Sequence, residues 1–307
     1  MPTYLMSYPG ASWHPPVPEG GIGHPQLAFR EWLTLCDAIT RAGAQILVMP
    51  PPAVEPPLHG LVYASSLGHL LGVGDRLTFL LSRHPEPERQ TEPEFVHLFL
   101  AEAGLTTRPA QHTWGGQADL LPVGGNRYIA AWGAHVQRQS MEDLRPLLPP
   151  GARCLEVELR EPFRHGGEVL GVITNKAGDT VVLVHAAALA DVSLEALRNF
   201  VGARVEVYPI DEADTRARAT AALAVAGTLL APLGLSSGLR GQLARRGFLL
   251  EEIELPHLLG PRNGPRDLVN ELRGLVVTSD APTYITLRGE LMALADSYPV
   301  TSPPAAT

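Results

Sequence analysis

The stretch ITRAGAQILVMPP, residues 39–51, contains the pattern that decides the fold: the end of a helix, a glycine, a short apolar strand and then prolines. A glycine just past a helix takes the left-handed conformation that closes the last turn, and the apolar and β-branched residues after it favour a strand. The pattern returns at LAEAGLTTRPA (100–110), LLPPGARCLEVELREP (147–162), FVGARVEVYP (200–209) and ARRGFLLEEIELP (244–256). Its glycines recur about every 50 residues, which indicates an internal repeat. They are Gly43, Gly104, Gly151, Gly202 and Gly247.

Outward from these glycines, each unit is predicted to hold a helix before the glycine and a strand after it. The helices are expected at about 26–42, 88–103, 140–148, 193–201 and 236–246. Between them lie hairpin-like segments, RLTFLLSR (76–83), ADLLPVGGNRYIAAWG (118–133) and GEVLGVITNKAGDTVVLVHA (167–186), with turn residues GGN and NKAGD. Each unit therefore reads strand, strand, helix, strand. The predicted fold class is α/β with five units about a pseudo-five-fold axis, and a generic α/β sheet is the alternative.

No linker rich in glycine or serine divides the repeat, so residues 1–297 are expected to form a single domain. Residues 4–8 are predicted to form a strand and residues 9–25 a loop rich in proline and glycine. The segment 298–307 is expected to be a frayed tail. Closing five units about one axis would place their inner strand ends around a central cavity, where a ligand would bind.

The composition is that of an ordinary globular protein, with 307 residues, 45% hydrophobic and 18% charged. A formal net charge of -8 argues against a nucleic-acid partner, because nucleic-acid modules need clustered cations. The longest apolar stretch, TAALAVAGTLLAPLGL (220–235), is interrupted by Gly227, Pro232 and Gly234 and is shorter than the ~20 residues that cross a bilayer. No signal peptide is evident, so a cytoplasmic protein without a membrane partner is expected.

Few residues suit metal, thiol or lysine chemistry. Lys176 is the only lysine and lies in a predicted turn, which argues against a catalytic lysine. Cys36 in FREWLTLCDAITRAG and Cys154 in RCLEVEL are the only cysteines, and both are expected to be small buried apolar residues. The histidines show no HxxxH, HExxH or HxH spacing and no CxxC occurs, so no metal site or cofactor is expected. Three histidines on different loops could still meet in the cavity: His59, His135 and His165.

Three segments carry a resemblance to a known family: FLLSRHPEPERQTEPEFVHLFLAEAGL (79–105), GGQADLLPVGGNRYIAAWG (115–133) and EPFRHGGEVLGVITNKAGDTVVLVHAAAL (161–189). With them the chain resembles the pentein fold of guanidino-group-modifying enzymes, such as dimethylarginine dimethylaminohydrolases, arginine deiminases and amidinotransferases, over about residues 4–277. In that family a cysteine near the C-terminus attacks the guanidinium carbon, a histidine shuttles protons and carboxylates hold the nitrogens. The reaction needs a thiolate because resonance makes this carbon a poor electrophile.

The resemblance identifies two candidate catalytic residues. The family's histidine matches His165 in FRHGG, and the closing aspartate of its E-G-x-G-D stretch matches Asp119. The acidic residue that opens that stretch falls on Gly115 or Gly116 in WGGQAD. The candidate ligand-binding residues are Ser66, His135, Trp114 and Arg83.

Other family positions lack the expected side chain. An early aspartate and asparagine fall on Gly60 and Ser66, neither of which can hold a guanidinium by charge, and the arginine for the substrate carboxylate falls on His135.

The nucleophile is missing as well. The family's R-C-L-T text fits residues 273–276 best, which places the cysteine position at Gly274. Registers that place it at Asn270 or Asp267 do not supply a thiol either.

The leading hypothesis is a degenerate, catalytically inactive homologue of these enzymes that binds a small molecule in the central cavity or serves as a regulatory partner of another protein. Glycines at charged positions predict a ligand less cationic than arginine. The alternative is a cysteine-independent hydrolase of a C–N bond, in which His165 activates water and Asp119 orients it. A third interpretation, a translation-factor-like pentein on a ribonucleoprotein, is disfavoured by the negative charge. A homodimer is expected only on general grounds.

Overall fold

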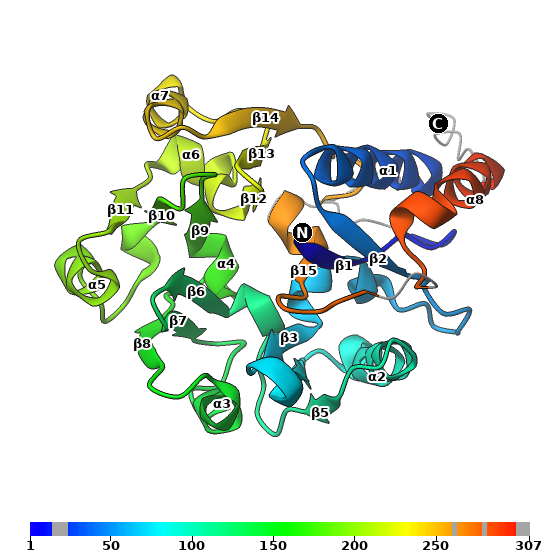
Figure 1. Cartoon of the computed structure of the whole chain (residues 1–307), viewed down its shortest axis with the longest axis horizontal. Coiled ribbons are helices and arrows are strands. Elements are labelled where there is room, and N and C mark those ends of the chain that lie inside the picture. Colours follow the sequence, from blue (N-terminus) through cyan, green and yellow to red (C-terminus); the bar gives the residue numbers. More distant parts are fainter. Residues whose placement is uncertain (14–23, 260–262, 278–280, 299–307) are drawn as a thin grey trace, which may run out of the picture.

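The computed structural model describes residues 1–13, 24–259, 263–277 and 281–298. It confirms the predicted α/β architecture: five three-stranded sheets surround a common centre, and a helix lies on the outer side of each (Figure 1). In every sheet the first two strands are antiparallel, and the third returns parallel to the second. The order strand, strand, helix, strand is therefore confirmed.

Four units follow one another along the chain. The first contains β3 (Gly68–Leu71), β4 (Thr78–Leu81), α2 (Glu92–Glu102) and β5 (Thr107–Pro109). The second contains β6 (Leu120–Gly124), β7 (Arg127–Trp132), α3 (Ser140–Leu144) and β8 (Arg153–Glu158). The third contains β9 (Leu170–Thr174), β10 (Thr180–Val184), α5 (Leu194–Val201) and β11 (Val205–Pro209). The fourth contains β12 (Leu223–Val225), β13 (Thr228–Pro232), α7 (Ser237–Arg245) and β14 (Leu249–Ile253).

The fifth unit joins the two ends of the chain. It contains β15 (Asn270–Glu271), β1 (Thr3–Ser7), α1 (Pro25–Arg41) and β2 (Gln45–Met49). The antiparallel pairing of β1 with β15 closes the ring. Asn270 then links this unit to the first, because its buried amide donates to the backbone oxygens of Ala64 and Gly68 at 2.9 and 2.8 Å.

The repeat glycines have the conformation that the sequence predicts. All five have a positive φ, and that of Gly104 is 79°. A Cβ at Gly104 would meet nothing within 4 Å. Backbone conformation and not lack of space therefore selects glycine here.

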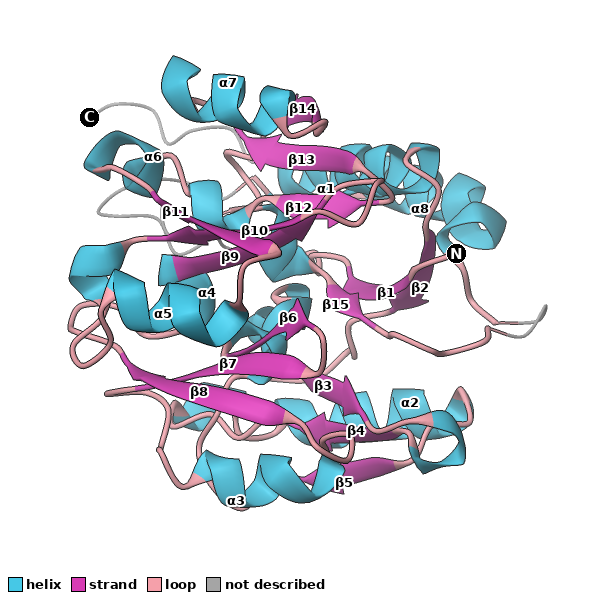
Figure 2. Ribbon diagram, turned by 60° about the vertical axis from the view of Figure 1, so that its left-hand side comes forward, coloured by secondary structure: helices cyan, strands magenta, loops and turns pink. Residues whose placement is uncertain are grey.

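The hydrophobic core is divided into five clusters that lie between neighbouring units. One, for example, combines Leu121 and Ile129 of the second sheet with Leu170 and Val182 of the third. The other clusters join the remaining neighbours in the same way. The sheets thus pack against their neighbours through their faces, and the helices lie at the periphery (Figure 2).

Several elements differ from the sequence prediction. The apolar stretch 220–235 contains the hairpin of β12 and β13, which turns at Ala226 and Gly227 with φ of 47° and 99°. The helix predicted at 140–148 ends at Leu144, and a 3₁₀ turn over Arg145–Leu147 follows because Pro146 lacks the N–H that an α-helix needs. Three helices were not expected: α4 (Gly166–Val169), α6 (Glu212–Arg216) and α8 (Tyr284–Ser297).

The predicted loop and tail lie largely outside the described residues, at 14–23 and 299–307. Tyr298, assigned to the frayed tail, is instead buried, and its hydroxyl donates to the backbone oxygen of Pro9 at 3.2 Å. An aromatic side chain with a packed ring and a paired hydroxyl is held in place. In the described part of the chain, no helix combines the length and apolar character needed to span a membrane.

Candidate functional site

The structure brings the two candidate catalytic residues into direct contact. Nδ1 of His165 lies 3.0 Å from Oδ2 and 3.3 Å from Oδ1 of Asp119, and we call this pair the dyad. The carboxylate also accepts the N–H groups of Gly115 and Gly166, at 2.7 and 2.9 Å. Asp119 is only 2% exposed in its side chain, whereas His165 is 24% exposed. The dyad is therefore a fixed carboxylate that orients a partly accessible imidazole.

The backbone of His165 is fixed by the short helix that follows it. Glu168 Oε1 accepts the N–H groups of Arg164 and His165 at 2.9 and 3.0 Å. Nδ1 faces Asp119, and Nε2 of His165 has no hydrogen-bond partner among the described residues. The imidazole can therefore exchange a proton at Nε2 with a bound molecule.

The charges around His165 oppose one another. Burial lowers the pKa of His165, but the charge of Asp119 and its hydrogen bond raise it, and the net pKa is above the ordinary value of 6.5. Glu168 also raises this pKa, and Arg89 lowers it. The charge of Asp119 thus favours the protonated imidazole, whereas burial disfavours it.

Gly115 has a steric reason to be glycine. A Cβ at this position would lie 2.7 Å from both Asp119 Oδ2 and His165 Cε1. The dyad itself occupies the space into which a longer side chain would extend. An acidic residue at Gly115 is therefore incompatible with the dyad as it stands.

On the segment that ends in β15, Asp267 and not Gly274 interacts with His165. Burial raises the pKa of Asp267, and the charges of Arg266 and His165 lower it. A Cβ at Gly274 would contact only Leu77. A Cβ at Gly167, two residues after His165, would lie 2.5 Å from Arg266 Nη2, so the segment that carries Arg266 and Asp267 borders the loop of His165. The register that places the family's cysteine position at Asp267 fits this arrangement better than the alignment with Gly274.

The space at Gly60 is filled by an ion pair. A Cβ at Gly60 would lie 2.4 Å from Arg89 Nε and closer still to Glu92 Oε1. Arg89 donates to Glu92 Oε2 through Nε and Nη2 at 2.9 and 2.8 Å, and Glu92 is buried. A buried arginine–carboxylate pair thus stands where the resemblance expects a carboxylate for the substrate.

Ser66 and His84 connect this pair to the dyad. Ser66 Oγ accepts from Arg89 Nη2 at 2.9 Å, and His84 Nε2 lies 3.0 Å from the Ser66 backbone oxygen. Burial and then the charge of Arg89 lower the pKa of His84 to about 2, so this imidazole stays neutral. The charges of Arg89 and His165 both act on His84, which places all three in one cluster.

The other proposed ligand-binding residues lie apart from the dyad or are engaged elsewhere. His135 Nδ1 lies 3.2 Å from Glu86 Oε1, and Arg83 donates to the Gln111 backbone oxygen at 3.0 Å. Trp114 is buried and donates to the Leu81 backbone oxygen at 3.1 Å. Ligand binding by these side chains stays a prediction.

Neither cysteine is placed to act as a nucleophile. Cys36 is buried in α1 with its Sγ 3.8 Å from Met6 Sδ, and Cys154 is half-buried on β8, so the expected full burial holds only for Cys36. Burial raises the pKa of both thiols, that of Cys154 to about 11. Both are therefore thiols and not thiolates at neutral pH.

The three histidines do not converge. His59 packs against Trp13 with ring centroids 5.8 Å apart, while His135 and His165 pair with different carboxylates. Within the described residues, no group of three or more His, Cys, Asp or Glu side chains is placed to hold a metal ion.

Sequence reasoning did not single out Arg89 or Arg266, and it considered Asp267 only as an alternative register that supplies no thiol. Arg89 lies in the quoted text PER, so its motif was visible, but nothing local shows that it reaches Ser66 across 23 residues. Arg266 and Asp267 face the dyad only because ring closure brings their segment there.

Comparisons with known proteins agree with this fold. No family model and no curated protein sequence matches the chain. Among solved structures, the product-bound N-terminal domain of ArgZ, an arginine dihydrolase from the ornithine–ammonia cycle in cyanobacteria, has a TM-score of 0.76 and 20% identity, covering 90% of this chain and 99% of that chain. Unliganded AgrE has a TM-score of 0.76 and 20% identity, covering 92% of this chain and 40% of that chain.

A third structure, a dimethylarginine dimethylaminohydrolase adduct with S-methyl-L-thiocitrulline, has a TM-score of 0.66 and 14% identity over 88% of this chain and 99% of that chain. Identities this low establish the fold alone. The chain has the pentein fold, in agreement with the resemblance in its sequence.

Proposed function

We propose that this pentein binds a small polar ligand beside the dyad and does not carry out covalent guanidine hydrolysis. The proposal is supported by Asp267, which stands on the segment where the resemblance expects a thiol and whose pKa is lowered by the charge of His165. Its neighbour Arg266 reaches Gly167, which places this segment next to the loop of His165. A carboxylate next to a buried arginine is a weak nucleophile toward a resonance-stabilised carbon. The retained dyad would then recognise a ligand.

The ligand is expected to accept a hydrogen bond and to be less cationic than arginine. Nε2 of His165 has no partner among the described residues. The raised pKa of His165 favours the protonated imidazole, in which Nε2 donates a hydrogen bond. Arg89 already pairs with Glu92, and together they fill the space at Gly60. A guanidinium would be repelled by the positive charges of Arg89 and Arg266, whereas a carbonyl or carboxylate oxygen would be attracted by them.

The test combines binding with turnover. The protein is incubated with arginine, methylated arginines, agmatine and citrulline, while thermal shift and released ammonia, amine or urea are recorded. We expect no product, and a shift with citrulline that His165→Ala removes and that His97→Ala, on the exposed face of α2, leaves unchanged. Product released by the wild-type protein and not by His165→Ala would overturn the proposal.

A second candidate is hydrolysis without a covalent intermediate. The oriented imidazole with a free Nε2 favours it. In this scheme neutral His165 takes a proton from water as the oxygen bonds to the substrate carbon, and the departing amine then receives that proton. Because the imidazole must be neutral, product release would rise as the pH passes the raised pKa of His165 and would disappear in His165→Ala.

A regulatory role through a protein partner, homodimer formation and a cytoplasmic location stay predictions. Absence of both product and shift would turn the search toward such a partner.

A further inference from the structure

A cavity of about 600 Å³ lies at the opposite end of the inner strands from the dyad. Asp119 precedes β6 and His165 precedes β9, whereas the cavity is lined by Pro122 near the end of β6 and by Val172 and Thr174 along β9. Most of the lining therefore lies toward the ends of the inner strands that are remote from the dyad, while Gln117 and Arg266 extend it toward the dyad. Neither Asp119 nor His165 lines the cavity.

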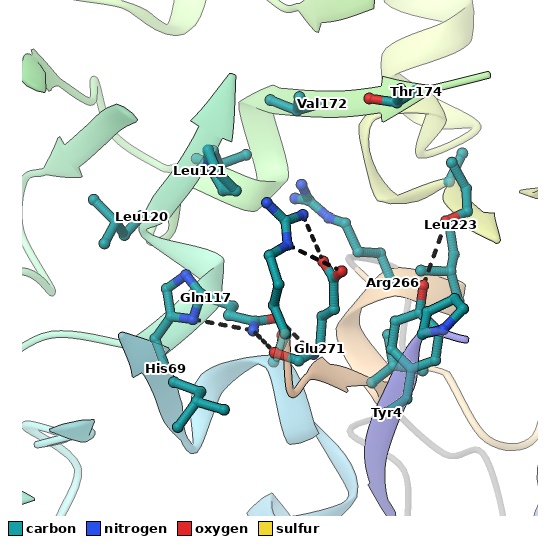
Figure 3. A pocket seen from close by; sticks show the side chains of 18 of the residues that line it. Tyr4, His69, Gln117, Leu120, Leu121, Val172, Thr174, Leu223, Arg266 and Glu271 are labelled. Atoms are coloured by element: carbon teal, nitrogen blue, oxygen red, sulfur yellow. Dashed lines mark hydrogen bonds and ion pairs between the residues drawn. The ribbon is translucent and has the colours of Figure 1, made fainter. Parts of the chain in front are cut away.

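One part of the cavity wall is apolar. It is formed by aliphatic residues of the inner strands β3, β6, β9 and β12 and of the segment just before β15, several of which Figure 3 shows. They include Leu70, Leu120, Leu121, Val172, Leu223 and Val269. A wall of this kind and a space of this size suit the hydrocarbon part of a small molecule.

The charges that line the cavity are mainly positive. Lys176, Arg266 and Arg273 line it together with a single carboxylate, that of Glu271. Arg273 donates to Glu271 through Nε at 3.3 Å and Nη2 at 3.1 Å, which leaves its Nη1 without a partner in the described structure. The ammonium of Lys176 likewise has no ion pair among the described residues. Two of the three cations are thus available to an anion.

A neutral donor group completes the wall. Gln117 is oriented by Glu271, because its Nε2 donates to the Glu271 backbone oxygen at 2.7 Å and its Oε1 accepts the Glu271 N–H at 2.9 Å. The same Nε2 donates to His69 Nδ1 at 3.1 Å, so His69 carries its proton on Nε2 (Figure 3). That Nε2 is buried and has no hydrogen-bond partner among the described residues. Gln117 is therefore held in place at the cavity wall by the Glu271 backbone and by His69.

We propose that this cavity binds a small organic carboxylate with an apolar body. The hydrocarbon part lies against the aliphatic wall, and the carboxylate lies toward Arg273 and Lys176. The excess of cations selects the anion, because an uncharged molecule of the same shape would leave them uncompensated. The inference does not depend on His165 or on the ligand proposed for the dyad.

Octanoate is the probe, and octanol, which has the same chain without the charge, is its control. Titration calorimetry of the full chain should show one octanoate per protein and at least about tenfold weaker binding of octanol, which corresponds to about 1.4 kcal/mol. Arg273→Met removes the cation and keeps an unbranched apolar side chain, and it should weaken octanoate binding about tenfold. Val172→Trp should abolish binding by filling the cavity, and His165→Ala should leave it unchanged.

The outcomes separate this proposal from the function proposed for the dyad. Octanoate binding that is as tight in Arg273→Met as in the wild-type protein, or equal binding of octanol, would overturn the anion site. Binding lost in His165→Ala and kept in Arg273→Met would assign octanoate to the dyad. If Val172→Trp fails to fold, Arg273→Met decides alone, because that side chain is 66% exposed and tolerates substitution.

Discussion

At the scale of single residues, the protonation of His165 depends on one neighbour. Burial alone would lower the pKa of His165, and Asp119 reverses that effect. Asp119→Asn keeps the shape and removes the charge, so we expect the pKa of His165 to fall below 6.5 in the variant. An NMR titration of the imidazole measures it, with Asp296→Asn on the surface as the control. An unchanged pKa in Asp119→Asn would contradict the assignment.

The same shift predicts a pH dependence of stability. A histidine whose pKa is raised on folding stabilises the fold below its unfolded pKa, and the contribution is lost as the pH rises through the folded pKa. The free energy of unfolding of the wild-type protein relative to Asp119→Asn should therefore increase as the pH falls from about 9 to about 6. Urea denaturation of both proteins at several pH values tests this. A difference in the free energy of unfolding that does not depend on pH would argue against the charged pair of His165 and Asp119.

Restoring a thiol at position 267 tests whether the missing cysteine is the only reason to expect no hydrolysis of arginine. In Asp267→Cys we expect iodoacetamide to label the new thiol and arginine still to give no product. The reason is that Gly60 and Gly115 have no room for the carboxylates that would hold a guanidinium. Cys36 and Cys154 in the wild-type protein provide the background labelling. Release of ammonia from arginine would show that the site still binds guanidinium.

At the scale of elements, the end of each repeat helix depends on a left-handed glycine. Gly104 has a φ of 79° and open space around its Cα. Gly104→Ala should therefore cost about 1–2 kcal/mol through strain in the backbone alone. Gly289, exposed within α8 and also without a neighbour within 4 Å, is the matched control, and Gly289→Ala should stabilise by about 0.5–1 kcal/mol. Chemical denaturation measures the free energy of unfolding of both variants. A change of the same sign in Gly104→Ala and Gly289→Ala would contradict this explanation.

At the scale of the whole molecule, the five units are expected to unfold together. Each core cluster lies between two units, so losing one unit exposes the faces of both neighbours. All four tryptophans lie outside the third and fourth units, at Trp13, Trp32, Trp114 and Trp132. Tryptophan fluorescence and far-ultraviolet circular dichroism should therefore give the same urea midpoint. Separate midpoints would show that the third and fourth units unfold independently.

Much of the fold could be predicted because its signals are local. Glycine at the end of a helix and turn residues between apolar runs act on their nearest neighbours in the chain, as at Gly104 and at the NKAGD turn. The same holds for His165 and Asp119, whose motifs could be compared with a known family. The hairpin at 226–227 was missed because its strands are as apolar as the buried core on both sides.

The sequence by itself therefore determined the repeating unit, the pentein resemblance and the two members of the dyad. Only the tertiary structure decided that Asp267 and not Gly274 faces His165, and that Arg89 and Glu92 fill the space at Gly60. These contacts, like the proposed carboxylate-binding cavity, depend on β15 pairing with β1, which are separated by almost the whole chain. Closing the ring brings together side chains whose local sequences carry no information about one another.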